Sequence, residues 1–165
     1  MIFKKYFKEL LLGLFIALFI ITILQKIFII ATIHTESMYP TLKVHQRVLI
    51  KPQDNVQRSH IYAFKREGGY LIKRCIAVAG DHVEINNNQV ILNGKLLQEN
   101  YISSDCNDTL NLDLIVPENA VFFMGDNRAV SNDSRYWDNK FIDESDVLGE
   151  VTFSIIPFQK INEGE

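Results

Sequence analysis

The chain is poor in cysteine and lacks the residue spacings of metal, nucleotide and nucleic-acid sites. Its 165 residues include two cysteines, Cys75 and Cys106. They form neither a close metal-binding pair nor a disulfide framework, although one disulfide between them stays possible. No spacing of histidine, cysteine and carboxylate residues suggests zinc, and no Gly-rich phosphate loop is present. The net charge is −3 with both signs interspersed, so there is no basic footprint for nucleic acid.

The N-terminus carries the clearest topological signal. Lys4, Lys5 and Lys8 precede an apolar run over residues 10–24, which resumes at residues 27–31. A helix needs about 20 apolar residues to cross a bilayer, and the positive-inside rule keeps the lysine-rich end in the cytoplasm. The sequence therefore predicts a single-pass protein of the cell membrane.

This topology divides the chain into three parts. We expect a cytoplasmic N-terminus over 1–9, a transmembrane signal anchor over 10–30 and an extracytoplasmic domain over 31–165. A cleaved signal peptide fits less well, because no small-x-small site follows the apolar run. A buried core helix is the other alternative.

The domain over 31–165 is predicted to be mostly β. Short alternating or β-rich segments recur between turn signals, which is typical of antiparallel sheets. We expect strands at 28–32, 47–50, 61–65, 70–79, 82–86, 89–92, 120–124 and 149–155. Residues 82–118 are expected to form a smaller hairpin and loop extension. Helix in this domain should be short, around 134–139 or 143–147.

Two residues suggest nucleophilic catalysis. Ser37 follows the apolar run, and Lys73 lies in the apolar segment 70–79. Desolvation lowers the pKa of a lysine from about 10.4, so that it can accept a proton from a serine hydroxyl. In a strand, Lys73 and Arg74 would point to opposite faces. Taken singly, however, a strand lysine usually reaches solvent, and a serine is usually a turn or helix-cap residue.

A histidine base is the alternative. His34, His45, His60 and His82 are available. None lies in a recognisable nucleophile–base motif, and the Gly-x-Ser-x-Gly elbow is absent. We therefore expect surface or packing roles for all four.

Three motifs in order resemble those of type I signal peptidases. They are Ser-Met-x-Pro-Thr-Leu at residues 37–42, Lys-Arg at 73–74, and Gly-Asp-Asn-Arg-x-x-Ser-x-Asp-Ser-Arg at 125–135. Each motif alone is weak, but three in register behind a membrane segment are specific. The compact domain is similar to the small Gram-positive forms. Mitochondrial inner-membrane peptidases stay possible, whereas the endoplasmic-reticulum form has histidine in place of this lysine.

The resemblance implies a role for each motif residue. Ser37 would be the acylating nucleophile and Lys73 its general base. The hydroxyl of Thr35 would help the backbone N–H of Ser37 to bind the oxyanion, and Ser131 would orient the lysine. Two ion pairs would support the site, Arg74 with Asp126 and Arg135 with Asp133.

The resemblance also implies a fold and a reaction. The fold would be a coiled antiparallel β-sheet catalytic domain of the signal peptidase type, with a small hairpin extension, behind one N-terminal transmembrane helix. The reaction would be hydrolysis of one peptide bond, through an acyl-enzyme, in exported preproteins with small-x-small cleavage sites. It needs no metal or organic cofactor. The implied partners are these preproteins, the lipid bilayer and a secretion translocon.

Two other functions stay open at this point. A related serine–lysine protease could mature a dedicated substrate, such as a pilin. An anchored binding protein could keep the fold without catalysis, although a binder has no use for Ser37, Lys73 and Ser131 together.

Overall fold

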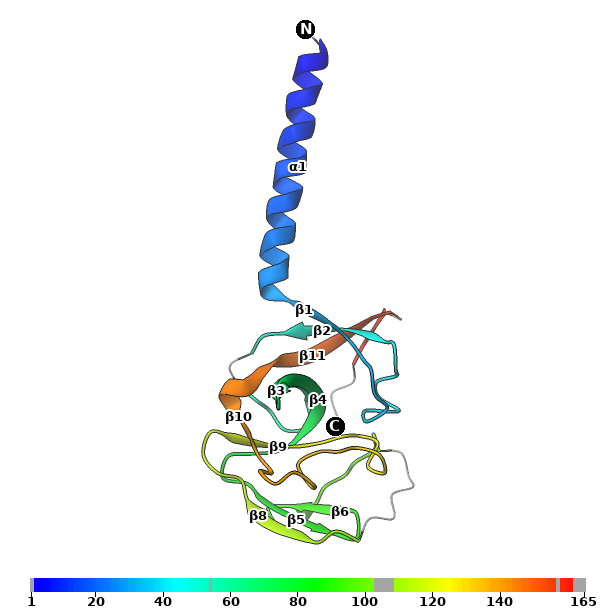
Figure 1. The fold of residues 1–165 in the computed structure, drawn as a ribbon, viewed down its shortest axis with the longest axis vertical. Helices are drawn as coiled ribbons and strands as arrows, with labels where there is room; N and C mark the ends of the chain where they lie inside the picture. Colours follow the sequence, from blue (N-terminus) through cyan, green and yellow to red (C-terminus); the bar gives the residue numbers. More distant parts are fainter. Residues whose placement is uncertain (1, 54, 103–108, 157, 162–165) are drawn as a thin grey trace.

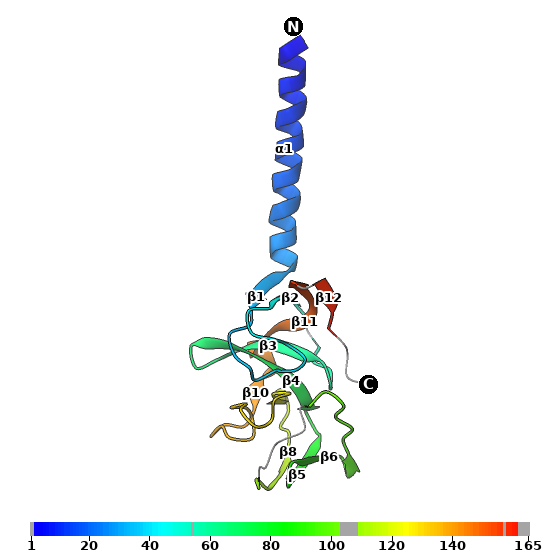
Figure 2. The same ribbon diagram turned by 90° about the vertical axis from the view of Figure 1, so that its right-hand side faces the viewer.

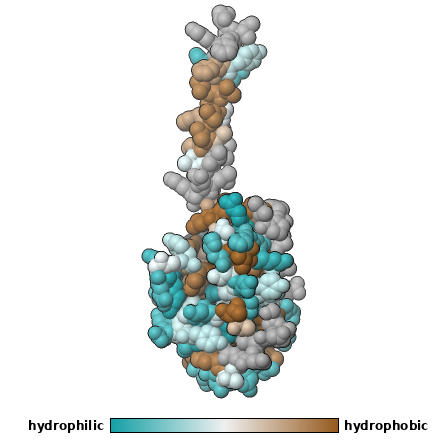
Figure 3. All heavy atoms as spheres, turned by 45° about the vertical axis from the view of Figure 1, so that its right-hand side comes forward, coloured by the Kyte–Doolittle hydropathy of each residue, from teal (hydrophilic) through white to brown (hydrophobic). Residues whose placement is uncertain are grey.

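The structure, a computed structural model, describes residues 2–53, 55–102, 109–156 and 158–161. One long helix, α1 (Ile2–Ile27), leads into a β domain whose strands lie in two sheets (Figures 1 and 2). In both views α1 stands away from the β domain. The described side chains of its apolar run, from Leu10 to Phe19, include many large exposed hydrophobics, and much of this surface is brown in Figure 3.

The helix does not have the same bounds as the predicted anchor over 10–30. The helix begins at Ile2, within the predicted cytoplasmic segment, and ends at Ile27. The β-branched residues after it form strand β1 (Ile29–Thr32), which is hydrogen-bonded to β2 (Arg47–Lys51) from the pair Ile29–Ile50 to the pair Thr32–Arg47. Among the described residues, no helix combines the length and hydropathy required of a membrane span. The predicted span is therefore not confirmed.

The larger sheet carries the three motifs singled out in the sequence. Its neighbouring strands, all antiparallel, follow the order β1-β2-β11-β3-β4-β9-β10, and β12 pairs with β11. The strands not yet bounded are β3 (Ile61–Arg66), β4 (Gly69–Val78), β9 (Ala120–Met124), β10 (Ile142–Asp143), β11 (Val147–Ile156) and β12 (Phe158–Lys160). β11 thus separates β2 from β3, although it comes much later in the chain.

The smaller sheet lies within the extension predicted over 82–118, of which residues 103–108 are outside the described part of the chain. Its order is β7-β6-β5-β8, with β5 (His82–Asn86), β6 (Gln89–Leu92), β7 (Lys95–Leu96) and β8 (Leu112–Ile115). It lies at the end of the β domain far from α1 (Figure 1). Asn87 and Asn88 both have positive φ angles, of 47° and 69°, which asparagine tolerates better than most residues. They close the β5–β6 hairpin that the sequence predicted.

The predicted strands are all present, with small shifts at their ends, so the mostly β, antiparallel prediction is confirmed. Helix in the domain is short, as expected: a 3₁₀ turn spans Glu144–Asp146, and residues 134–139 form turns and bends. Four strands were not predicted: β7, β8, β10 and β12. In the described sheets, β7, β8 and β10 lie at an edge, and β12 pairs with β11. Short strands in such positions do not need the long apolar alternation of a central strand, which is the pattern that the sequence prediction relied on.

Candidate active site

Ser37 lies in a tight turn that follows β1. The backbone N–H of Leu42 donates to the carbonyl of Met38 over 2.8 Å, and both side chains are buried in an apolar cluster of the domain. This packing anchors the turn to the core. Ser37 itself is nearly buried, with 8% of the residue exposed. The hydroxyls of Ser37 and Thr35 lie 3.1 Å apart, within hydrogen-bond distance.

Lys73 is a buried cation on β4. It lies opposite Tyr62 of β3 in the register, and 3% of the residue is exposed. Burial lowers the pKa of Lys73 to about 8; the carboxylates of Asp133 and Asp126 oppose the shift, and Arg135 adds to it. A substantial fraction of this amine is therefore neutral, and able to accept a proton, near pH 8.

The loop after β9 is hydrogen-bonded to the turn that carries Ser37. The backbone N–H of Asn127 donates to the carbonyl of Ser37 over 3.0 Å, and its side chain donates to the carbonyl of Glu36 over 3.2 Å. Four residues further on, Ser131 is buried, and its Oγ has no hydrogen-bond partner in the structure. This hydroxyl therefore has free capacity to donate and accept.

The lysine and the two hydroxyls are not directly bonded in this state. Within the described residues, no hydrogen bond joins the Lys73 amine to Ser37 Oγ or to Ser131 Oγ. The loop that carries Ser131 also carries the charges that act on Lys73, namely Asp126, Asp133 and Arg135. The structure thus places charged residues of the third motif beside Lys73, without a hydrogen bond between Lys73 and Ser37.

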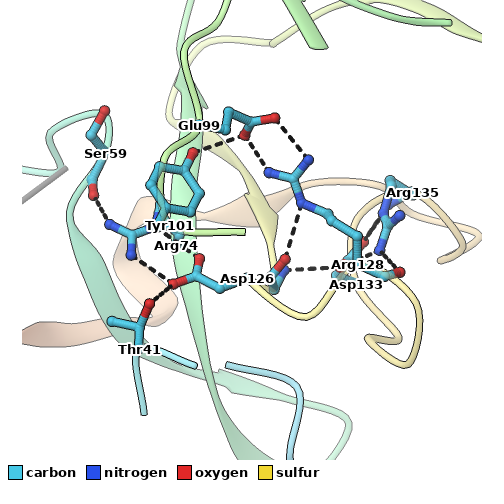
Figure 4. Close-up of polar contacts among 10 residues, drawn as sticks. Thr41, Ser59, Arg74, Glu99, Tyr101, Asp126, Arg128, Asp133 and Arg135 are labelled. Atoms are coloured by element: carbon cyan, nitrogen blue, oxygen red, sulfur yellow. Dashed lines mark hydrogen bonds and ion pairs between the residues drawn. The ribbon is translucent and has the colours of Figure 1, made fainter. Parts of the chain in front are cut away.

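The two predicted ion pairs are present (Figure 4). Arg74 donates to Asp126 through Nε over 2.8 Å and through Nη2 over 2.6 Å. Arg135 donates to Asp133 through Nε over 2.8 Å and through Nη2 over 3.0 Å. All four side chains are almost fully buried. Because buried charges are costly without partners, removing one member of either pair would leave the other uncompensated.

Sequence reasoning missed four residues of this network. Thr41 donates to Asp126 over 2.5 Å. Beside the Arg74–Asp126 pair, Glu99 accepts hydrogen bonds from both Tyr101 and Arg128. Thr41 and Arg128 stand inside the recognised motifs, so their positions were a usable signal. Glu99 and Tyr101 belong to no motif, and their contacts come from the folding of distant segments.

The histidines lie elsewhere. His60 pairs with Glu150 at 2.9 Å and His82 with Asp113 at 2.7 Å, while His34 and His45 are exposed. Within the described residues, none of the four hydrogen-bonds to Ser37.

Cys75 carries a free, buried thiol whose pKa is raised by burial, and Cys106 lies outside the described residues. Over the same part of the chain, no group of three or more histidine, cysteine and carboxylate side chains is arranged to hold a metal ion.

Known proteins are similar to this chain in sequence and in fold. A family model described as signal peptidase, peptidase S26, matches residues 4–156. The chain is 29% identical to signal peptidase IB of Staphylococcus aureus, covering 95% of this chain and 93% of that one. It is 32% identical to signal peptidase I S of Bacillus subtilis, covering 86% and 85%.

A solved structure extends the comparison to the fold. The crystal structure of a signal peptidase I from Enterococcus faecalis matches with a TM-score of 0.51 and 32% identity, over 59% of this chain and 97% of that one. Sequence, fold and motif geometry therefore agree, and the chain belongs to the signal peptidase family, peptidase S26, whose type I members are serine endopeptidases.

Proposed function

We propose that Ser37 and Lys73 act as a serine–lysine dyad that removes signal peptides from exported preproteins. The observation that carries this proposal is the burial of Lys73, which lowers the pKa of its amine to about 8. An amine of this kind can act as a general base near neutral pH, whereas an exposed lysine cannot. The names of the relatives support signal peptide removal as the reaction.

In the first half of the reaction, Ser37 Oγ attacks the carbonyl carbon of the scissile bond while the neutral Lys73 amine takes the hydroxyl proton. The backbone N–H of Ser37 and the hydroxyl of Thr35 stabilise the resulting oxyanion. The intermediate then collapses: the C–N bond breaks, the Lys73 ammonium gives its proton to the leaving amine, and the acyl group stays on Ser37.

In the second half, Lys73 takes a proton from water as the water oxygen attacks the ester carbon. The bond to Ser37 breaks, Ser37 Oγ recovers a proton from Lys73, and the signal peptide leaves with a new carboxylate. Ser131, whose buried hydroxyl has spare hydrogen-bonding capacity, would orient the amine. The dyad closes when substrate binds, since catalytic hydrogen bonds are often long in the free enzyme.

The enzyme is proposed to work at the cell membrane, attached through α1. The apolar side chains of this helix are exposed and are not packed against other described residues. A bilayer would cover them. The lysine-rich end would lie in the cytoplasm and the catalytic domain outside, close to substrates delivered by a secretion translocon. Resistance to alkaline carbonate extraction in the full chain, lost when α1 is deleted, would support this attachment.

Cleavage of a model preprotein tests the function directly. Wild-type protein in detergent or liposomes should cut after a small-x-small site, and Ser37→Ala should not. If neither protein cuts, the chain is a silent binding protein. If the wild type cuts one dedicated precursor but not general preproteins, it is a maturation peptidase with the same dyad.

A further inference from the structure

Two residues of the small-sheet extension reach across to the catalytic loop. Glu99 and Tyr101 follow β7; Glu99 pairs with Arg128 of the loop after β9, and the Tyr101 ring lies against the Arg74 guanidinium of β4 (Figure 4). Arg128 Nη1 donates to Glu99 Oε2 over 2.9 Å, and its Nη2 pairs with Glu99 Oε1. The side chains are 2% and 5% exposed, so this is a buried, two-pronged ion pair.

Tyr101 connects the Glu99–Arg128 pair to Arg74, which follows Lys73 in the sequence. Its hydroxyl donates to Glu99 Oε1 over 2.8 Å. The guanidinium carbon of Arg74 lies 3.8 Å from the centre of its ring, a cation–π distance. Burial raises the pKa of Tyr101, so its phenol stays protonated and remains a donor. One tyrosine therefore bridges Arg74 and Glu99.

Arg128 passes the contact on to the catalytic loop. Its Nε donates to the carbonyl of Gly125 over 3.1 Å, and its own carbonyl accepts from Arg135 Nη2 over 2.9 Å. Gly125 in turn donates its N–H to Asp133 over 2.9 Å. Glu99 thus holds one end of a chain of hydrogen bonds whose other end is the Asp133–Arg135 pair beside Lys73.

We propose that Glu99 and Tyr101 are positioning residues, a clamp from the extension that fixes the catalytic loop and Arg74 in the geometry needed for proton transfer. The inference deepens the proposed function and rests on it, because it concerns the same site. The clamp joins a segment of the extension to β4 and to the loop after β9, so the extension serves catalysis as well as folding. A displacement of about 1 Å in such a site can cost roughly 100-fold in rate.

The test compares four single variants of the full-length protein in detergent. Tyr101→Phe removes only the bond to Glu99, Tyr101→Leu also removes the ring over Arg74, and Glu99→Gln removes the charge facing Arg128. Tyr70→Leu is the matched control, because Tyr70 is 70% exposed and lies outside the network. For each variant, kcat, KM, the pH dependence of kcat and the melting temperature are measured with one preprotein.

The clamp predicts a selective loss of turnover. Glu99→Gln and Tyr101→Leu should lower kcat about 10- to 100-fold with KM unchanged, and Tyr101→Phe should lose less. In Glu99→Gln and Tyr101→Leu, the rising limb of the pH profile, which follows deprotonation of Lys73, should move to higher pH. Without the clamp, water can reach the Arg74–Asp126 pair and the neighbouring Lys73 amine. Hydration of this amine raises its pKa. Combining Glu99→Gln with Tyr101→Phe should cost less than the product of the single losses, because the two act as a unit.

Other outcomes overturn the inference. A lower melting temperature with wild-type kcat and pH profile would make the two residues purely structural. A raised KM with an unmoved pH limb would make them substrate contacts. Failure of the proposed function appears separately, as an inactive wild type or a Ser37→Ala variant that still cleaves.

Discussion

Gly125 and Ser37 lie so close together that a methyl group on the glycine would not fit. A Cβ at Gly125 would lie 2.4 Å from the carbonyl oxygen of Ser37 and 2.3 Å from Ser131 Oγ. Both distances are far below a van der Waals contact, and one of the two atoms belongs to the backbone. Gly125 therefore lets the nucleophile turn and the Ser131 loop touch.

We expect Gly125→Ala to lower kcat by about 100-fold or more, because the methyl group must push Ser37 and Ser131 apart. Stability should fall by roughly 1–3 kcal/mol, as for other overpacked sites. Gly69→Ala is the control, since the nearest atom to its Cβ would be 3.8 Å away. Kinetics and thermal unfolding of both variants measure the effect, and a fully active Gly125→Ala would show that the two loops need not touch.

Ser37→Ala and Lys73→Ala should each abolish processing while the fold is kept. A hydroxyl without its base, or a base without its hydroxyl, has no covalent route. Lys73→Arg should also fail because the guanidinium stays charged, and Lys73→His because the ring is too short to reach. Preprotein cleavage and circular dichroism give the readout. Near-normal cleavage by Ser37→Ala or Lys73→Ala would remove the serine–lysine assignment.

Thr35→Ala should lower kcat more than it raises KM. Its hydroxyl lies 3.1 Å from that of Ser37, and losing one oxyanion donor typically costs about 100- to 1,000-fold in rate. Thr35→Ser keeps a hydroxyl and should stay largely active. If the alanine variant works within about twofold of wild type, Thr35 only packs beside the nucleophile.

Activity should rise with pH through about 8 and level off above it, because Lys73 must lose its proton before the attack and burial lowers its pKa to about 8. The pH profile of kcat/KM reports this ionisation in the free enzyme. A variant without the four histidines should keep the same limb. If the limb disappears with any one histidine, that histidine is the base and the lysine mechanism is wrong.

Lys73 should also make the protein more stable at higher pH. Its folded pKa of about 8 is below the ordinary lysine pKa of 10.5, so between these values the unfolded chain binds more protons than the folded one. This contribution to stability therefore increases as pH rises through that window and is most unfavourable below pH 8. Lys73→Met should raise the melting temperature at pH 7 and raise it less at pH 10. An equal gain at both pH values would mean that packing, and not charge, sets the cost.

The sequence predicted the strands and the ion pairs for different reasons. The β5–β6 hairpin was predictable because an asparagine turn separates two alternating segments. Arg74 and Asp126 pair across 52 positions of sequence, which spacing alone does not indicate; the family motifs supplied that pairing. β8 was missed because it is a short edge strand with alternate exposed residues.

The clamp around Glu99 could not be predicted in the same way. Neither Glu99 nor Tyr101 stands in a motif, and their partners Arg128 and Arg74 lie 29 and 27 positions away in sequence. Such contacts depend on how the extension folds back on the larger sheet. The strand over residues 29–32 was predicted from its β-branched residues, and its pairing with β2 explains why the helix ends before it.

The place of β11 in the larger sheet has a consequence for biosynthesis. β2 follows the Ser37 turn and β3 precedes the strand of Lys73; in the described sheet, β11 lies between them and pairs with both. β11 is made about 80 residues after β3, so a ribosome must add the whole extension and the catalytic loop before the two halves can join. We therefore expect the Ser37 turn and Lys73 to come into register only after β11 has been made, late in the synthesis of the chain.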